Sequence, residues 1–175
     1  MAEFKPYFPI LLKWEGTEYE DVDGDSGGAT KCGVILSEWV RDGYDKDGDG
    51  DIDKFDLMLI NEDDAAKIAK THYWDALKAD KINNQSVANI IVDAAYNQGM
   101  GYTPKMVQGI VGVESDGVFG NKTVEAINKF DQPTLFDRIK QARKDRYINV
   151  VNLYPKNKKF YTGWMNRLNS FTFKP

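Results

Sequence analysis

The sequence has very few of the residues that build disulfides, zinc sites and nucleophilic triads. One cysteine, Cys32, excludes an internal disulfide and any cysteine-built zinc site. One histidine, His72, excludes histidine-rich metal catalysis and argues against a serine or cysteine triad. We therefore expect any chemistry of this chain to use carboxylates.

Long apolar runs are also absent, since no stretch approaches the roughly 20 apolar residues of a membrane helix. We therefore expect no stable membrane insertion. The first residues carry Glu3 and Pro9 and precede no small-residue cleavage site, so we expect no signal peptide and synthesis in the cytoplasm. The 175 residues, 42% hydrophobic and 29% charged, suit one ordered domain, or one domain with a small appendage.

Charge is unevenly distributed along the chain. The net charge is −4, and residues 45–56 alone hold six Asp and two Lys. From Arg138 to Pro175 there are ten Lys or Arg and one acidic residue, Asp145. Such a basic end favours attraction to an anionic polymer such as cell wall or nucleic acid, or else forms a solvated helix face. No nucleic-acid motif accompanies it, so we expect no nucleic-acid partner.

The apolar spacing predicts a mainly α fold with one small β element near the amino end. The expected helices cover residues 4–15, a short segment capped by Ser37, residues 54–78 and 85–98, a helix begun by Thr103 and Pro104, and residues 121–130 and 134–153, with a last apolar face near 160–171. The glycine-rich segment from Gly16 to Gly33 predicts a hairpin or irregular strands. A weak joint near Gly99 divides the chain into residues 1–100 and 101–175, which we expect to pack as one compact unit.

The acidic segment from Asp45 to Asp56 fits the twelve-residue EF-hand calcium loop. The expected ligands are the side chains of Asp45, Asp47 and Asp49, the backbone carbonyl of Asp51, Asp53 through water, and Asp56 at the closing position where Glu is usual. Gly50 occupies the sharp turn. Six like charges repel unless a divalent cation gathers them, so we expect structural Ca²⁺ here, with a solvated acidic loop as the alternative.

The main chemical signal is a group of carboxylates near the amino end. Glu15 closes an apolar helix beside Trp14, where burial would raise its pKa and keep it protonated. Asp25 lies in a glycine-rich turn that should leave it ionised, and the hydroxyl of Thr30 is placed to help it hold a water. Two carboxylates in contrasting environments suit glycoside hydrolysis, although surface turns produce the same spacing.

This segment is similar to the start of the peptidoglycan-cleaving muramidases of glycoside hydrolase family 108. Their signature is Glu-Gly-Gly-Tyr, an acidic stretch, then Asp-x-Gly-Gly-x-Thr-x-x-Gly-Ile, and the matching positions here are Glu15-Gly16, Tyr19, Asp25 to Thr30 and Gly33-Val34. The resemblance implies a lysozyme-like helical fold with a small β-hairpin, Glu15 as general acid, and Asp25 and Thr30 positioning the attacking water. Thr17 replaces the second glycine and one residue is inserted before Tyr19, so Asp21 or Asp23 replaces Asp25 if the turn is shifted.

The resemblance continues downstream. Tyr73-Trp74 falls where the family has a Tyr-Trp pair, residues 92–99 resemble its central helix, and residues 116–126 resemble the Asp-Gly-x-Phe-Gly-x-x-Thr signature of peptidoglycan-binding helical segments. It implies substrate contacts at Trp74, Tyr96, Asn97 and Gly99. Packing in the core or at the helix end is the alternative for the first three.

The leading interpretation is a muramidase, or lysozyme, that hydrolyses the β-1,4 bond between N-acetylmuramic acid and N-acetylglucosamine. Two alternatives are a lytic transglycosylase, which cuts the same bond without water, and a non-catalytic peptidoglycan-binding or secretion-assisting module. We expect a monomer that acts on peptidoglycan in the periplasm or outside the cell. It would reach the wall as an endolysin released by a holin, or by export beside a secretion apparatus.

Overall fold

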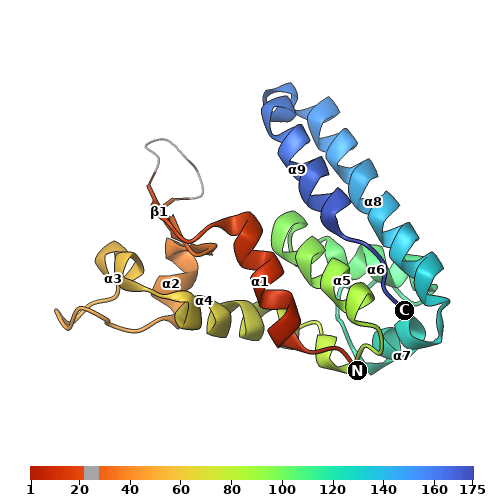
Figure 1. The fold of residues 1–175 in the computed structure, drawn as a ribbon, viewed down its shortest axis with the longest axis horizontal. Helices are drawn as coiled ribbons and strands as arrows, with labels where there is room; N and C mark the ends of the chain where they lie inside the picture. Colours follow the sequence, from red (N-terminus) through yellow and green to blue (C-terminus); the bar gives the residue numbers. More distant parts are fainter. Residues whose placement is uncertain (22–27) are drawn as a thin grey trace. The chain divides into compact units, whose positions relative to one another are not determined.

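The computed structural model describes residues 1–21 and 28–175 and is mainly helical (Figure 1). Its contacts divide the chain into two compact units. Lys5–His72 form the amino-terminal unit, and Tyr73–Pro175 with Met1–Phe4 form the carboxy-terminal unit. The predicted fold class, mainly α with a small β element near the amino end, is confirmed. The predicted division at residue 100 stays a prediction. Every helix in the described ranges is too short or too polar to cross a lipid bilayer.

In the amino-terminal unit, a helix leads directly toward a small sheet. α1 (Phe4–Glu15) has the bounds predicted from its apolar spacing, and it buries Tyr7 and Leu11. Gly16 ends the helix in a left-handed conformation (φ +76°), which a residue without Cβ adopts at low cost. The Gly16 N–H binds the Leu12 carbonyl at 2.9 Å, so the last turn of α1 closes around Glu15.

The sheet has three short antiparallel strands. They are β1 (Tyr19–Glu20), β2 (Thr30–Lys31) and β3 (Val34–Ile35), arranged in that order. Thr30 pairs with Glu20 on one side and Ile35 on the other, so it lies in the central strand. Cys32 and Gly33 both have positive φ (52° and 77°), as in the two-residue turns whose twist matches that of the strands they join.

Three short helices complete this unit. α2 (Leu36–Asp42), α3 (Lys54–Leu59) and α4 (Glu62–Ala69) pack around a core that includes Trp39 and Leu57. The prediction that Ser37 caps α2 is wrong, because the helix already begins at Leu36, after Ile35, which makes no side-chain cap. The predicted continuous helix over residues 54–78 is also wrong. Asn61 breaks it by starting α4 with its own capping box, and α4 continues into a π-helical turn, η1 (Lys70–Asp75).

The carboxy-terminal unit is a set of helices around α5. Its elements are η2 (Ala79–Lys81), α5 (Gln85–Gln98), α6 (Thr103–Val111), α7 (Asn121–Lys129), α8 (Gln132–Leu153), η3 (Pro155–Asn157) and α9 (Lys158–Ser170). α5 has the predicted bounds and is buried from Ser86 to Ala95, where it packs against α6 and α8. α8 and α9, drawn in blue in Figure 1, form a helical hairpin through η3. The N-cap of α6 is Tyr102 rather than the predicted Thr103.

Candidate functional site

The predicted general acid lies where α1 meets the sheet. Glu15 is the last residue of α1 and is partly buried, as is Trp14 before it. Lys13 Nζ lies 5.8 Å from the centre of the Trp14 ring. The chain then turns at Gly16 and enters β1 at Tyr19. Glu15 therefore occupies a helix end that is partly shielded from solvent without being closed to it.

Thr30, the predicted water-positioning hydroxyl, is partly buried in the central strand. The segment after Glu15 is tied to the turn after Thr30, because Cys32 Sγ donates to the Thr17 carbonyl at 3.5 Å. Burial raises the pKa of the Cys32 thiol, which favours this neutral packing role. The three-stranded sheet and this hydrogen bond thus hold together the segments that follow Glu15 and Thr30.

The second predicted carboxylate, Asp25, lies outside the described residues, and so does its alternative Asp23. The other alternative, Asp21, is exposed and accepts a hydrogen bond from the Tyr19 hydroxyl at 3.2 Å. Burial, together with the neighbouring Asp21 charge, raises the pKa of Tyr19. Tyr19 therefore stays protonated near neutral pH and can keep donating to Asp21.

The predicted substrate contacts belong to the carboxy-terminal unit and have different surroundings. Trp74 is only 1% exposed and meets Phe4 edge to face at 5.7 Å, which is a core position. Tyr96 is partly buried and its ring centre lies 4.4 Å from that of Tyr73. Gly99 is exposed and caps α5 with φ +95°. The end of α5 therefore offers a partly open aromatic pair, whereas Trp74 packs inside.

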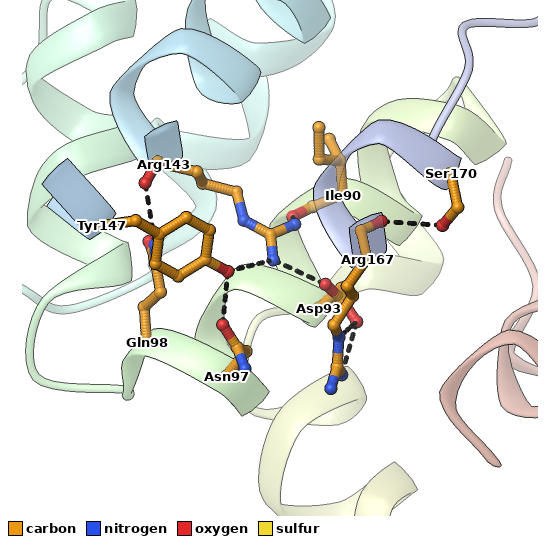
Figure 2. Close-up of polar contacts among 8 residues, drawn as sticks. All are labelled: Ile90, Asp93, Asn97, Gln98, Arg143, Tyr147, Arg167 and Ser170. Atoms are coloured by element: carbon orange, nitrogen blue, oxygen red, sulfur yellow. Dashed lines mark hydrogen bonds and ion pairs between the residues drawn. The ribbon is translucent and has the colours of Figure 1, made fainter. Parts of the chain in front are cut away.

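Asn97 is engaged by the protein itself. Its side-chain oxygen accepts a hydrogen bond from the Tyr147 hydroxyl, which also lies 3.4 Å from Arg143 Nη2 (Figure 2). The Tyr147 ring stacks on Trp164 at 5.2 Å. Asn97 thus connects the end of α5 to α8 and, through Tyr147, to α9.

A buried ion cluster beside Asn97 was not foreseen from the sequence (Figure 2). Asp93 has no exposed side-chain surface, and both of its carboxylate oxygens are bound by guanidinium groups. Arg143 Nη2 lies 2.6 Å from one oxygen, and Arg167 Nη2 lies 2.7 Å from the other. Two of the ten cations counted in the basic end therefore stabilise the join of α5, α8 and α9 instead of forming a basic surface.

The acidic loop is organised by its own carboxylates. Asp45 accepts hydrogen bonds from the N–H groups of Gly48 and Gly50, at 2.6 and 2.9 Å. The candidate ligands form two sets of three, and within each set the ligand oxygens lie within 4.8 Å of one another. The first set is Asp45, Asp47 and Asp49, and the second is Asp51, Asp53 and Asp56. Gly48 and Gly50 have positive φ (84° and 103°), which the tight turn requires. All donors are oxygens, the type preferred by Ca²⁺ and Mg²⁺.

Asp56 holds the two ends of this loop together. It is fully buried and accepts N–H bonds from Asp53, Lys46 and Asp47 at 2.8, 2.5 and 3.1 Å. These bonds, the one from Asp53 first, lower the pKa of Asp56 and keep it ionised. Partial desolvation and then the neighbouring charges, that of Asp49 first, raise the pKa of Asp47, and the charge of Asp49 also raises that of Asp51, so the carboxylates of the loop repel one another.

The loop is also fastened to α4. Lys46 Nζ lies 2.6 Å from Asp64 Oδ2, and the Tyr44 hydroxyl donates to Asp64 Oδ1 at 3.1 Å. Asp64 in turn closes the capping box of Asn61. A change in the conformation of the loop would therefore act directly on the start of α4.

The turn before α7, in the segment that resembles the peptidoglycan-binding signature, is held by hydrogen bonds within the protein. Asp116 accepts hydrogen bonds from Val118 N and from Gln108 Nε2, at 2.8 and 2.7 Å. Phe119 is buried and Gly117 has φ +83°. Gln108, which carries no sequence signal, is buried inside this turn and also binds the Gly117 N–H at 2.9 Å.

Comparison with known proteins places two families side by side along the chain. Residues 8–99 match the family described as "Glycosyl hydrolase 108", and residues 102–169 match the one described as "Predicted Peptidoglycan domain". The structure of SagA from Brucella abortus is similar, with 25% sequence identity and a TM-score of 0.72 over 96% of this chain and 94% of that chain. No curated protein matches the sequence. The first matched segment contains Glu15, Asp25 and Thr30.

Proposed function

We propose that this chain, which belongs to the glycosyl hydrolase 108 family, is a muramidase that hydrolyses the β-1,4 bond between N-acetylmuramic acid and N-acetylglucosamine in peptidoglycan. The observation that carries the proposal is the family match over residues 8–99, in which Glu15 lies at a half-shielded helix end. The match to a peptidoglycan domain over residues 102–169 supports the same substrate.

In this proposal Glu15 is the general acid. The carboxyl end of a helix carries partial negative charge from its unpaired carbonyls, which disfavours a charged carboxylate and favours the neutral acid. The neutral side chain donates its proton to the glycosidic oxygen as the bond to the leaving sugar breaks. Asp25, assisted by the Thr30 hydroxyl, takes the proton of the attacking water on the opposite face of the sugar. Tyr96, Asn97 and Gly99 are the proposed substrate contacts at the end of α5.

A matched pair of variants tests the assignment of the acid. Glu15→Gln keeps the shape of the side chain but has no proton to give, so wall lysis should fall by about a hundredfold or more. Glu18→Gln makes the same change at an exposed position in the same segment and should lyse like the wild type. Far-UV circular dichroism checks that both variants fold. Lysis by Glu15→Gln at the level of Glu18→Gln would remove Glu15 from the mechanism.

The products separate hydrolysis from the alternative cleavage. A muramidase adds water across the bond, whereas a lytic transglycosylase leaves a 1,6-anhydro end that is lighter by one water. Mass spectrometry of digested peptidoglycan should show the hydrated ends. Anhydro ends would identify a transglycosylase, for which Asp25 is not required. A non-catalytic wall-binding module, favoured by the peptidoglycan-domain match, would bind the polymer without releasing fragments.

We also propose that the acidic loop holds a structural Ca²⁺. Oxygen donors and glycines at the tight turns support it, as do carboxylates held close enough to repel one another. Asp45, Asp47 and Asp49 would bind through their side chains, Asp51 through its carbonyl, Asp53 through water, and Asp56 would close the site. Calorimetric titration with Ca²⁺, and separately with Mg²⁺, should give one site that Asp45→Asn weakens and Asp63→Asn, on exposed α4 surface, leaves unchanged. Absence of binding at millimolar Ca²⁺ would overturn this proposal and favour the alternative, a solvated acidic loop.

Because the proposed substrate lies outside the cytoplasmic membrane, we further propose that the chain reaches it through holin-type lesions or beside a secretion apparatus.

A further inference from the structure

The outer part of the α8–α9 hairpin, residues 148–166, is described throughout and has no buried side chain. We call this segment the hairpin tip. It carries three large apolar side chains that are about half exposed or more, Leu153 at 72%, Tyr154 at 57% and Phe160 at 48%. Ile148 is also exposed. Apolar surface concentrated at one end of a helical hairpin marks a place where the chain meets another apolar phase.

The charge of the hairpin tip has one sign. The sequence contains no acidic residue from Arg146 to Pro175, and Lys156, Lys158 and Lys159 are exposed among the apolar side chains of the tip. Lys159 Nζ lies 4.8 Å from the centre of the Phe160 ring, so cation and aromatic face are presented together. The surface that covers the tip must therefore offer both apolar groups and negative charge.

Stacked aromatic rings connect the hairpin tip to the buried core of the carboxy-terminal unit. The ring of Trp164 stacks between Phe160 at 6.0 Å and Tyr147 at 5.2 Å. Tyr147 is buried and its hydroxyl binds Asn97. This aromatic ladder connects the exposed Phe160 with the buried core of the unit, so the tip presents a shape that exists before any partner arrives.

We propose that the hairpin tip docks on the surface of an anionic lipid bilayer. Leu153, Tyr154 and Phe160 enter the boundary between headgroups and acyl chains, and Lys156, Lys158 and Lys159 contact headgroup phosphates. Lysine stems lie along apolar surface while their ammonium groups stay in the polar layer, which suits a tip built of both kinds of residue. No helix of the described residues can span a bilayer, so this contact is peripheral.

The same observations disfavour the other occupants. A second copy that paired tip to tip would bring two sets of lysines together without any acidic partner, since residues 146–175 contain none. Peptidoglycan offers negative charge on its peptide stems, but it has no continuous apolar phase to cover Leu153 and Tyr154. The lipid surface supplies both requirements, and the inference does not depend on the muramidase assignment.

Vesicle binding by the full chain tests the proposal directly. The wild type should sediment with vesicles of equal parts phosphatidylcholine and phosphatidylglycerol, and far less with phosphatidylcholine alone. The triple variant Lys156→Gln, Lys158→Gln, Lys159→Gln should bind the anionic vesicles about a hundredfold more weakly, since each lysine near such a surface contributes about a fivefold factor. Added salt should weaken wild-type binding, because it screens exposed charges.

A matched control separates the tip from overall charge. Lys105, Lys122 and Lys129 are exposed lysines elsewhere in the same unit, and changing all three to Gln removes the same charge. This control should bind like the wild type. A Leu153→Ser, Tyr154→Ser variant keeps every lysine and should also lose binding. All variants should digest lipid-free peptidoglycan like the wild type, and Glu15→Gln should still bind vesicles, so the two proposals fail independently.

Three outcomes would overturn the proposal. The first is equal vesicle binding by the tip and control variants. The second is no vesicle binding together with tip-dependent sedimentation on purified peptidoglycan, which would assign the tip to the wall polymer. The third is a dimer in sedimentation equilibrium that Leu153→Ser, Tyr154→Ser abolishes, which would assign the tip to a second copy.

Discussion

Arg143 donates from Nη2 to Asp93 across 2.6 Å, and neither side chain has any exposed surface. Because Arg167 binds the other oxygen of the same carboxylate, Asp93 is the buried anion that compensates two buried cations. Asp93→Asn would leave both guanidinium groups without a counter-charge, so we expect it to lower the free energy of unfolding by about 3–5 kcal/mol. Urea unfolding measures the effect. Asp145→Asn, at an exposed position on α8, is the control and should be nearly neutral; equal effects of the two changes would contradict the role of Asp93.

The bond between Tyr147 and Asn97 predicts coupling between α8 and α5. Tyr147→Phe and Asn97→Ala each remove the same hydrogen bond, so their effects on the free energy of unfolding should be non-additive. In a double-mutant cycle we expect a coupling of about 0.5–3 kcal/mol. Kinetics on peptidoglycan fragments add the second measurement. If Asn97 also contacts substrate, as proposed, Asn97→Ala raises KM while Tyr147→Phe leaves KM near the wild-type value. Strictly additive effects on the free energy of unfolding would show that this hydrogen bond does not couple the two helices.

The bounds of a helix can be predicted from the sequence where its first and last residues are set by capping side chains or glycines nearby in the chain. α5 has the predicted bounds because its buried run stands between two local signals, the Asn84 side chain that caps it and Gly99 that ends it. The break between α3 and α4 was missed because the apolar spacing continues across it. Its signal was present in the polar residues, since Asn61 and Asp64 form a capping box, as Asp53 and Asp56 do one helix earlier.

Some positions of the candidate site could likewise be predicted from the local sequence, and others could not. The position of Glu15 at a helix end and of Thr30 in a strand follows from glycines and apolar spacing nearby in the sequence. The burial of Trp74 and the engagement of Asn97 depend on residues far away in the chain, which no local pattern reveals. Arg143 and Arg167 illustrate the limit most clearly. Counting charge assigns them to a basic surface, whereas tertiary packing brings them to Asp93.

The contact between the acidic loop and α4 predicts a pH dependence of stability. Burial alone would raise the pKa of Asp64, but the bonds from Lys46, Asn61 and Tyr44 outweigh it and lower that pKa. A carboxyl whose pKa is lower in the folded chain stabilises the fold above its unfolded pKa of about 4, and this contribution is lost as the pH falls through the folded value. Asp64→Asn should therefore cost about 1 kcal/mol at neutral pH. The difference from wild type should shrink as the pH falls below about 4 and vanish once the pH is below the folded pKa of Asp64.

Unfolding by urea at several pH values, in chelator, measures this difference without any bound metal. Asp63→Asn is the matched control, because Asp63 lies beside Asp64 in the first turn of α4 but is exposed. Its effect should stay small across the same range. An Asp64→Asn penalty that grew as the pH fell toward 4 would have the wrong sign for this contact.

Two glycines predict opposite responses to the same substitution. At Gly43 an added Cβ would lie 2.5 Å from the Trp39 carbonyl oxygen and from its indole ring, and Trp39 is buried and cannot withdraw. Gly43→Ala should therefore destabilise the amino-terminal unit by about 1–3 kcal/mol. At Gly163, inside α9, an added Cβ meets nothing within 4 Å among the described residues. Gly163→Ala should stabilise by about 0.5–1 kcal/mol, since alanine loses less backbone freedom in a helix. Thermal unfolding of the two variants beside the wild type gives both signs in one experiment, and a gain in stability at Gly43 would mean that the backbone after α2 can move away from Trp39.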